Sequence, residues 1–193
     1  MNDDTRDWPT SVWTKWPLAA LAAGCVTSFA VAPGAVGVLG AALFALTLAV
    51  AIVDWRELII PGWMNAAIFA LGLAQAATWA EDGARGAALT QALAHGMALG
   101  GVLLLVKLIY ARARGREGLG LGDVKLAGAG GVWLGWSSLP VAIEIAALSA
   151  LAVFLVAPRL AGRPAQWNER LPFGSFLAPA IWTTWLIQTL FAA

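Results

Sequence analysis

Two aspartates are the residues of this chain whose type and placement could do chemistry. Asp54 ends one apolar run, and Asp123 interrupts another in the stretch GLGLGDVKLAG, residues 118–128. Two carboxylates held a few ångströms apart can share one proton and can work as general acid and general base. The alternative is that each aspartate is an ordinary helix-end charge that faces water. Which of these holds depends on the elements that position the two side chains.

Glycines surround Asp123 to an extent that helix capping alone does not require. A helix amino terminus favours an anion, but it needs no run of residues without side chains. Glycine lets another chain approach closely, so a carboxylate on this backbone could meet an extended peptide inside a packed bundle. The alternative is that the glycines serve only helix packing. Packing explains the glycines of residues 128–135 well, but it explains poorly why a charged residue lies among the glycines. The glycines in question are Gly118, Gly120, Gly122, Gly128, Gly130 and Gly131.

The composition indicates that lipid is the solvent for most of the chain. Of its 193 residues, 60% are hydrophobic and 12% are charged, whereas soluble domains average about 25% charged residues. The net charge of +1 gives no basic field for nucleic acid. The single cysteine, Cys25, excludes an internal disulfide, and no Cys/His cluster suggests zinc. The sequence therefore predicts a membrane protein without a metal site or cofactor.

The hydropathy pattern predicts an all-α, polytopic transmembrane helix bundle. A membrane-spanning helix needs roughly 20 residues, and five of the seven apolar segments reach that length comfortably. The segments 17–32 and 121–136 are short, and the first could be re-entrant or interfacial, so seven spans are expected with six as the alternative. We expect residues 1–16 to form a cytoplasmic amino-terminal segment and residues 17–193 to form one integral-membrane domain. The apolar segments are 17–32, 34–53, 63–80, 87–110, 121–136, 138–158 and 173–192.

The basic residues predict the orientation of these spans. Three arginines lie in each of the loops 111–118 and 159–171, whereas the loop 81–86 holds one arginine and two acids. Seven spans with the amino terminus inside place eleven of the twelve basic residues on the cytoplasmic side, as the positive-inside rule favours. This threading also places Asp54 and Asp123 near the cytoplasmic membrane boundary, although 69 positions separate them.

Three motifs resemble those of the type IV prepilin peptidases, a family of GxGD membrane aspartyl proteases. Residues 120–123 read GLGD, and with residues 124–126 they are similar to the family's GxGDxKL element. Residues 54–61, DWRELIIP, resemble the stretch that follows its first aspartate, and residues 171–178, LPFGSFLA, resemble its PFGPFLA stretch. The chain departs from the family at Gly62, where asparagine or aspartate is usual, and at Ser175, where proline is frequent.

The resemblance implies a site and a substrate. Asp54 and Asp123 would be the catalytic dyad, while Lys125 would either anchor the backbone or meet an acidic substrate residue. The substrate would be a prepilin or pseudopilin whose basic leader is removed at the cytoplasmic face of the bacterial inner membrane, in contact with membrane lipid and with pilus or secretion assembly proteins. The residues that match the motifs and would bind substrate or support the site are Gly120, Gly122, Lys125, Pro61, Pro172, Phe173 and Gly174.

Longer members of that family carry an amino-terminal region with cysteine pairs, associated with methylation of the new amino terminus. No such region is evident here, so the chain is expected to be similar to the short, peptidase-only members, including those that serve Flp/Tad-type pili. Two other functions stay open at this point: a small proton-coupled transporter and a non-catalytic component of a pilus or secretion assembly. Acids at one face rather than at mid-membrane disfavour the transporter, and the presence of both aspartates disfavours the non-catalytic component.

Other isolated polar residues have less specific explanations. Asn65 and Lys107 fall near the predicted inner boundary and could line the substrate path. Glu144 and His95 fall toward the predicted outer side, where a structural or interfacial role is expected for the acid and a packing role for the histidine.

Overall fold

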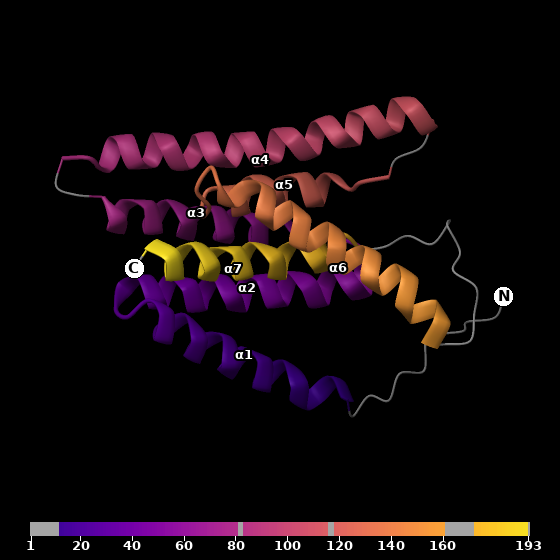
Figure 1. Ribbon diagram of the computed structural model, residues 1–193, viewed down its shortest axis with the longest axis horizontal. Coiled ribbons are helices and arrows are strands. Elements are labelled where there is room, and N and C mark those ends of the chain that lie inside the picture. Colours follow the sequence, from indigo (N-terminus) through magenta and orange to yellow (C-terminus); the bar gives the residue numbers. More distant parts are fainter. Residues whose placement is uncertain (1–11, 81–82, 116–117, 161–171, 193) are drawn as a thin grey trace.

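The computed structural model describes residues 12–80, 83–115, 118–160 and 172–192, and the regular structure in these ranges is helical throughout. Successive helices run in alternating directions, so that the carboxyl end of α2 and the amino ends of α3, α5 and α7 lie toward the same end of the bundle (Figure 1). The helices are α1 (Val12–Val31), α2 (Ala35–Glu57), α3 (Gly62–Trp79), α4 (Arg85–Arg114), α5 (Leu121–Gly131), α6 (Ser138–Leu160) and α7 (Gly174–Ala192).

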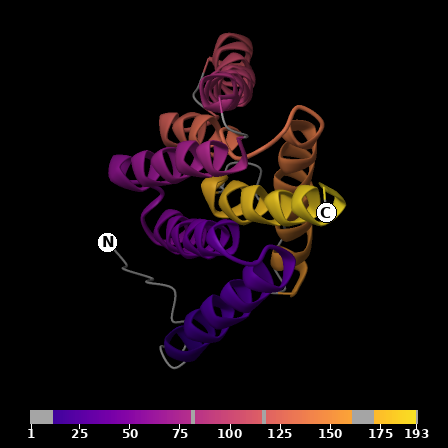
Figure 2. The same cartoon turned by 90° about the vertical axis from the view of Figure 1, so that its left-hand side faces the viewer.

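Helix α7 occupies the middle of this arrangement. Seen end-on, α1 and α4 lie on opposite outer sides and α6 covers a third side (Figure 2). The contacts agree, because α7 packs against α2, α6, α5 and α1, whereas α4 packs against α5 and α3. Helix α7 therefore packs against four of the other helices.

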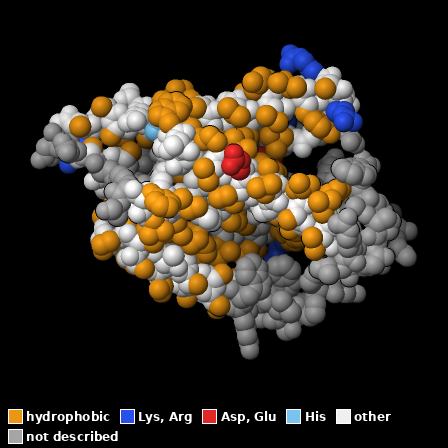
Figure 3. Space-filling model, in the orientation of Figure 1, with side chains coloured by type: hydrophobic (Ala, Val, Ile, Leu, Met, Phe, Trp, Pro, Cys, Tyr) orange, Lys and Arg blue, Asp and Glu red, His pale blue; other side chains and the backbone are white. Residues whose placement is uncertain are grey.

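The helix bundle predicted from hydropathy is confirmed. In the described ranges, three helices are long and apolar enough to cross a membrane by length and composition, namely Ala35–Glu57, Arg85–Arg114 and Ser138–Val156. A shorter apolar helix covers Pro17–Val31. Hydrophobic side chains cover much of the face shown in Figure 3, as lipid contact requires. The number of spans and their orientation stay predictions.

Several helix ends differ from the predicted ones. Residues 12–16 belong to α1, although they were expected to precede the first apolar helix, and residues 1–11 lie outside the described part of the chain. Helix α4 continues through Arg114 into the predicted loop, because alanine and arginine favour helix. Gly115, with a left-handed φ of 64°, then ends that helix.

Helix α5 is shorter than the segment 121–136 in which a span was expected. It has 11 residues, which at about 1.5 Å per residue is roughly half the thickness of a bilayer core. After Gly131 the chain turns, with the amides of Trp133 and Leu134 bonded to the carbonyls of Gly130 and Gly131. Poor helix propensity of the glycines explains the early end.

Two tryptophans tie the helices together in the core. Trp185 on α7 is fully buried, and its indole N–H donates to Gln75 Oε1 of α3 at 2.9 Å. Trp133 packs edge-on against Trp185, with ring centroids 6.4 Å apart, and its own indole donates to the Ile68 carbonyl at 2.8 Å. Buried indole N–H groups need such partners, so these bonds fix α3, α7 and the turn after α5 relative to one another.

Glycines allow α4 and α5 to approach at backbone distance. A Cβ added at Gly96 would lie 2.7 Å from the Gly128 carbonyl oxygen, and one added at Gly100 would lie 3.1 Å from the Gly128 Cα. Small residues at such interfaces are typical of helix packing in membranes. The packing role considered for the glycines after Asp123 therefore applies to Gly128.

The contact between Gly40 and Trp185 generates a stability prediction. A Cβ on Gly40 would overlap the indole ring of Trp185, which is fully buried and held by its hydrogen bond to Gln75. Gly40→Ala should therefore lower the free energy of unfolding by about 1–3 kcal/mol, as overpacking of a core does. The measurement is thermal unfolding of purified protein in detergent.

Gly101→Ala on α4 is the matched control. A Cβ there meets nothing within 4 Å, so alanine should be neutral or should stabilise by up to about 1 kcal/mol through helix propensity. A Gly40→Ala protein that melts as Gly101→Ala does would contradict this account of the core.

Candidate functional site

Three helix ends bring the candidate residues together. Asp54 lies in the last turn of α2, Asp123 lies in the first turn of α5, and Gly174 and Ser175 begin α7. These ends gather at the same end of the bundle (Figure 1). Both aspartates are nevertheless buried, with 5% and 8% of their surfaces exposed. A buried carboxylate needs hydrogen-bond donors, so the partners of each oxygen describe the site.

Asp54 is held by the amino terminus of α7. Its Oδ2 accepts a hydrogen bond from the Ser175 backbone N–H at 2.8 Å and lies 3.2 Å from the Ser175 hydroxyl. The two residues are 121 positions apart in the sequence. Free N–H groups and the helix dipole favour an anion at a helix amino terminus. The first turn of α7 therefore gives Asp54 the polar surroundings that its own helix end does not.

Asp123 is held by the start of its own helix. Its Oδ2 accepts from the Gly120 backbone N–H at 3.1 Å, which is the side-chain half of a capping box. A Cβ added at Gly120 would lie 3.2 Å from that same oxygen. The bare backbone at this position thus lets the carboxylate fold back onto the preceding turn.

Gly174 separates the two carboxylates. A Cβ added to it would lie 2.9 Å from Asp54 Oδ2 and 3.0 Å from Asp123 Oδ1, so these two oxygens face each other across one glycine. The Gly174 backbone amide interacts with both side chains. Two carboxylates that both lie this close to one glycine cannot both ionise readily, and they can hold one proton between them. The arrangement is therefore suited to acid–base chemistry.

A cavity opens beside the two acids. It has a volume of about 220 Å³ and is lined, besides the aspartates, by Leu58, Ile59, Ile60, Gly120, Leu121 and Gly122. Leu58 ends α2 with a left-handed φ of 56°, and its N–H bonds to the Asp54 carbonyl at 2.9 Å. The chain therefore leaves α2 abruptly after Asp54, so that residues 59–61 pass the cavity in a non-helical conformation.

Gly122 of α5 lies close to Ile60, which lines the cavity from the segment after α2. A Cβ added at Gly122 would lie 3.3 Å from the Ile60 Cβ, which is tight enough that the isoleucine would have to move. The bare backbone predicted for Gly122 therefore coincides with a narrow gap between α5 and the segment after α2. We note that Ile60 is buried, while Leu58, Ile59 and Leu121 are exposed at the rim.

The remaining residues of the motifs lie around this centre. Pro61 precedes α3, and Pro172 and Phe173 precede α7, where their carbonyls accept from the amides of Ser175, Phe176 and Leu177. Lys125 is exposed and is not among the residues that line the cavity. Its predicted roles, as an anchor or as a contact for an acidic substrate residue, stay untested.

Lys107 and Asn65 do not line the cavity. Lys107 is buried and donates to the Leu119 carbonyl at 2.9 Å, so it ties α4 to the backbone that leads into Gly120. Asn65 is buried on α3, and its side-chain atoms have no hydrogen-bond partner among the described residues. The structure thus supports a structural contact for Lys107 and leaves the role of Asn65 open.

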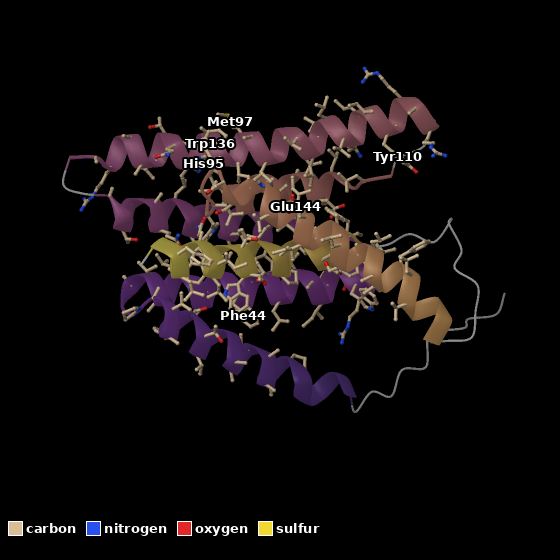
Figure 4. The ribbon with its side chains drawn as sticks, viewed as in Figure 1. Phe44, His95, Met97, Tyr110, Trp136 and Glu144 are labelled. Atoms are coloured by element: carbon tan, nitrogen blue, oxygen red, sulfur yellow. The ribbon has the colours of Figure 1, made fainter. Side chains whose placement is uncertain are left out.

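Figure 4 shows Glu144 on α6 and His95 on α4, and neither residue lines the cavity beside the two aspartates. Glu144 is exposed on α6, while His95 on α4 packs edge-on against Trp136, with ring centroids 4.6 Å apart. The His95 Nε2 has no partner among the described residues, so the packing expected of this histidine is present although one nitrogen remains unpaired.

In the described ranges, no three His, Cys, Asp or Glu side chains come together as a metal site.

Sequence reasoning missed the part played by Ser175. It identified this residue only as a departure from a motif, whereas the structure places both its amide and its hydroxyl on Asp54. No local pattern could have found the contact, because it joins α7 to α2 across most of the chain. The signal available was its place directly after Gly174 at the start of a helix, where backbone donors are free.

The comparisons with known proteins agree on one family. The model of the type IV leader peptidase family matches residues 41–155. A prepilin leader peptidase/N-methyltransferase of Burkholderia pseudomallei (strain 1026b) is 36% identical over 176 residues, which are 90% of this chain and 55% of that protein. No solved structure matches the chain.

Two further relatives carry the same name. The one from Dickeya chrysanthemi is 34% identical over 172 residues, covering 85% of this chain and 56% of that protein. The one from Stutzerimonas stutzeri is 29% identical over 186 residues, covering 91% and 60%. The chain therefore spans a little more than half the length of these curated relatives.

The position of Gly174 generates a prediction about activity. A methyl group there would meet Asp54 Oδ2, Asp123 Oδ1 and, at 2.6 Å, the Ile60 Cδ1. All three are ends of side chains that can rotate, so Gly174→Ala should fold with a melting temperature close to that of the parent. Turnover of a prepilin, the substrate that the names of the relatives suggest, should fall by roughly 100-fold or more, because small displacements of reacting groups have effects of that size.

Both quantities can be measured on one detergent-purified sample, by thermal unfolding and by initial cleavage rate. Gly62→Ala, where an added Cβ meets nothing within 4 Å, is the control and should change neither. Full turnover by Gly174→Ala would show that the reaction does not require the two carboxylates to lie this close to each other across Gly174.

Proposed function

The chain belongs to the type IV leader peptidase family, and from this premise we propose that it is an aspartic-type endopeptidase. Its substrates would be type IV prepilins or pseudopilins, from which it removes the leader. The observation that carries the aspartic mechanism is the pair of buried carboxylates that face each other across Gly174 beside an open cavity. The relatives' names also include an N-methyltransferase activity, whereas this proposal concerns the peptidase step.

The mechanism that we propose uses the two aspartates as one unit. One carboxylate accepts a proton from a water molecule as that water attacks the scissile carbonyl carbon. The other aspartate, which carries the shared proton, hydrogen-bonds the carbonyl oxygen and later helps to protonate the leaving amine. Both groups return to their starting protonation when the products leave, so the pair needs no further acid or base.

The walls of the cavity fit an extended peptide segment. One wall is the segment 58–60 that follows α2, and the other is the backbone of residues 120–122, where two of three residues are glycines. A scissile bond must be extended, because an amide within a helix presents neither face of its carbonyl to water and acid together. The glycines leave room for such a segment to lie close to Asp123.

The location of the site supports cleavage at a membrane surface. Asp54 lies one turn from the end of an apolar helix that could cross a bilayer, and Asp123 lies in the first turn of α5. With the orientation that the basic residues favour, this end of the bundle faces the cytoplasm of a bacterial inner membrane. A precursor could then keep its basic leader in the cytosol while its apolar helix stays in lipid.

Replacement of either aspartate by asparagine tests this proposal. Asp54→Asn and Asp123→Asn should each reduce leader cleavage of a purified prepilin below detection on a gel, because an amide can neither take up the proton nor carry the charge. Glu144→Gln is the matched control: it removes an exposed carboxylate on α6 and should cleave as the parent does.

Both aspartate variants should still accumulate in the membrane, since asparagine keeps the size and the polarity of the side chain. Substantial cleavage by either variant would overturn the aspartic mechanism. A parent protein that cleaves no prepilin, although it is folded, would overturn the proposed substrate.

A second prediction concerns reagents that act on other classes of peptidase. EDTA and thiol-directed reagents should leave the cleavage rate unchanged, because the proposed reaction uses neither a metal nor a thiol. Cys25 lies on α1 and does not line the cavity, so Cys25→Ser should be as active as the parent. Loss of cleavage in a folded Cys25→Ser protein, or inhibition by EDTA that added zinc reverses, would contradict the mechanism.

A further inference from the structure

Ser175 makes a set of hydrogen bonds that a helix-start serine does not ordinarily make. A capping serine bonds to an amide two or three residues further along its own helix. The Ser175 hydroxyl instead reaches α2, where it lies 3.0 Å from the Ala51 carbonyl oxygen and 3.2 Å from Asp54 Oδ2. Its backbone N–H also donates to that Oδ2, at 2.8 Å. The same N–H also lies 3.2 Å from the Pro172 carbonyl oxygen at the start of α7, whereas both contacts of the hydroxyl are made to α2.

We infer that Ser175 is a positioning residue for the cleavage reaction, one that holds Asp54 in place both before and after it takes up a proton. This inference rests on the proposed aspartic mechanism. Ser175 touches neither the water nor the peptide in this account, so it acts through Asp54 alone.

The backbone N–H provides the fixed part of this support. It comes from the first turn of α7, a helix whose packing against α2 is extensive and whose central tryptophan is locked by a hydrogen bond to α3. A donor on so rigid an element defines where Asp54 Oδ2 lies. A donor at that place favours one orientation of the carboxylate toward Asp123 and the cavity throughout the reaction.

The hydroxyl provides the adaptable part. It has one proton and two acceptors within reach, Ala51 O and Asp54 Oδ2, so it can donate to only one of them at a time. While Asp54 is ionised, the hydroxyl donates to it. When Asp54 has accepted the proton from the attacking water and is no longer charged, the hydroxyl turns its own proton to the Ala51 carbonyl, while the Ser175 N–H stays on Oδ2. No proton is gained or lost by the serine in this exchange.

The support is unequal for the two acids. Asp123 Oδ2 accepts from the Gly120 amide, and a backbone N–H cannot rotate toward another acceptor. The adaptable hydroxyl lies on Asp54. This difference suits Asp54 to the role of the base, whose state changes first, and suits Asp123 to the role of the acid.

The contact depends on the serine that this chain has at position 175 and would not form with every residue that could stand there. A proline at position 175 would have neither an amide proton nor a hydroxyl, so it could make none of these three bonds. The first turn of a helix accepts proline, and the helix would still form without them. Helix formation therefore does not explain why a serine is placed here against Asp54.

Kinetics of three variants test the inference. Ser175→Ala keeps the amide and loses the hydroxyl; its kcat should fall by about tenfold, as expected for the loss of a hydrogen bond to a charged group. Its KM should stay within about twofold of the parent value, because Ser175 does not contact substrate. Ser175→Thr restores a hydroxyl at the same position and should recover most of the lost kcat.

Ser149→Ala is the matched control. The Ser149 hydroxyl is also half-buried, and among the described residues it bonds to carbonyls of its own helix α6, at 2.7 Å and 3.0 Å, so its loss should leave kcat unchanged. The three proteins should melt close to the parent temperature.

The outcomes separate the inference from the function on which it rests. An unchanged kcat in Ser175→Ala, a loss confined to KM, or a threonine variant as slow as the alanine variant would overturn the role of Ser175 while the parent enzyme still cleaves. A parent that does not cleave would instead overturn the proposed function, and the Ser175 role with it.

Discussion

Burial of two carboxylates at the end of an apolar bundle is the constraint on which the rest of the structure depends. A charge removed from water is strongly destabilising unless donors replace the lost water. Asp54 and Asp123 are both more than nine-tenths buried, and each meets a helix amino terminus, one supplied by α7 and one by α5. Helix starts offer free N–H groups without adding a positive side chain that would neutralise the pair permanently.

This requirement explains why glycines gather here. A helix start can approach a carboxylate only where no side chain intervenes, and an added Cβ at Gly174 or Gly120 would lie within 3.2 Å of a carboxylate oxygen. At Gly122 the absence of a side chain likewise leaves room for Ile60, which lines the cavity from the segment after α2. The glycines further along α5 have a different function, because Gly128 and Gly131 bring α4 and α5 together. One glycine-rich stretch therefore serves the site at its beginning and helix packing at its end.

Much of the fold follows from local patterns, whereas the details of the site do not. Apolar segments of the right length predicted the helices, and alternating directions predicted that Asp54 and Asp123 lie toward the same end. The pattern overestimated the length of α5. Hydropathy alone does not take account of the poor helix propensity of the glycines, nor of the Trp133 indole bond in the turn that follows them. It also ended α4 too early, because the charged residues that suggest a loop are good helix formers.

The contacts that make the site useful join residues distant in sequence. The bonds from Ser175 to Asp54 and from Lys107 to Leu119 depend on how α7 and α4 pack, and single-sequence periodicity does not specify packing partners. Lys125 shows the converse. It stands two residues after Asp123 in the motif, yet it is exposed on α5, because two residues along a helix turn a side chain to a different face.

The central claim is that the two aspartates act as one unit, and a comparison of single and double variants tests it most directly. Residual single-turnover cleavage by Asp54→Asn, by Asp123→Asn and by the double variant can be followed by mass spectrometry at high enzyme concentration. If one shared proton is the basis of the reaction, the double variant should be no slower than either single variant, since residues that act as a unit are grossly non-additive. A double variant whose loss equals the product of the two single losses would show that the aspartates act independently, and would contradict the account.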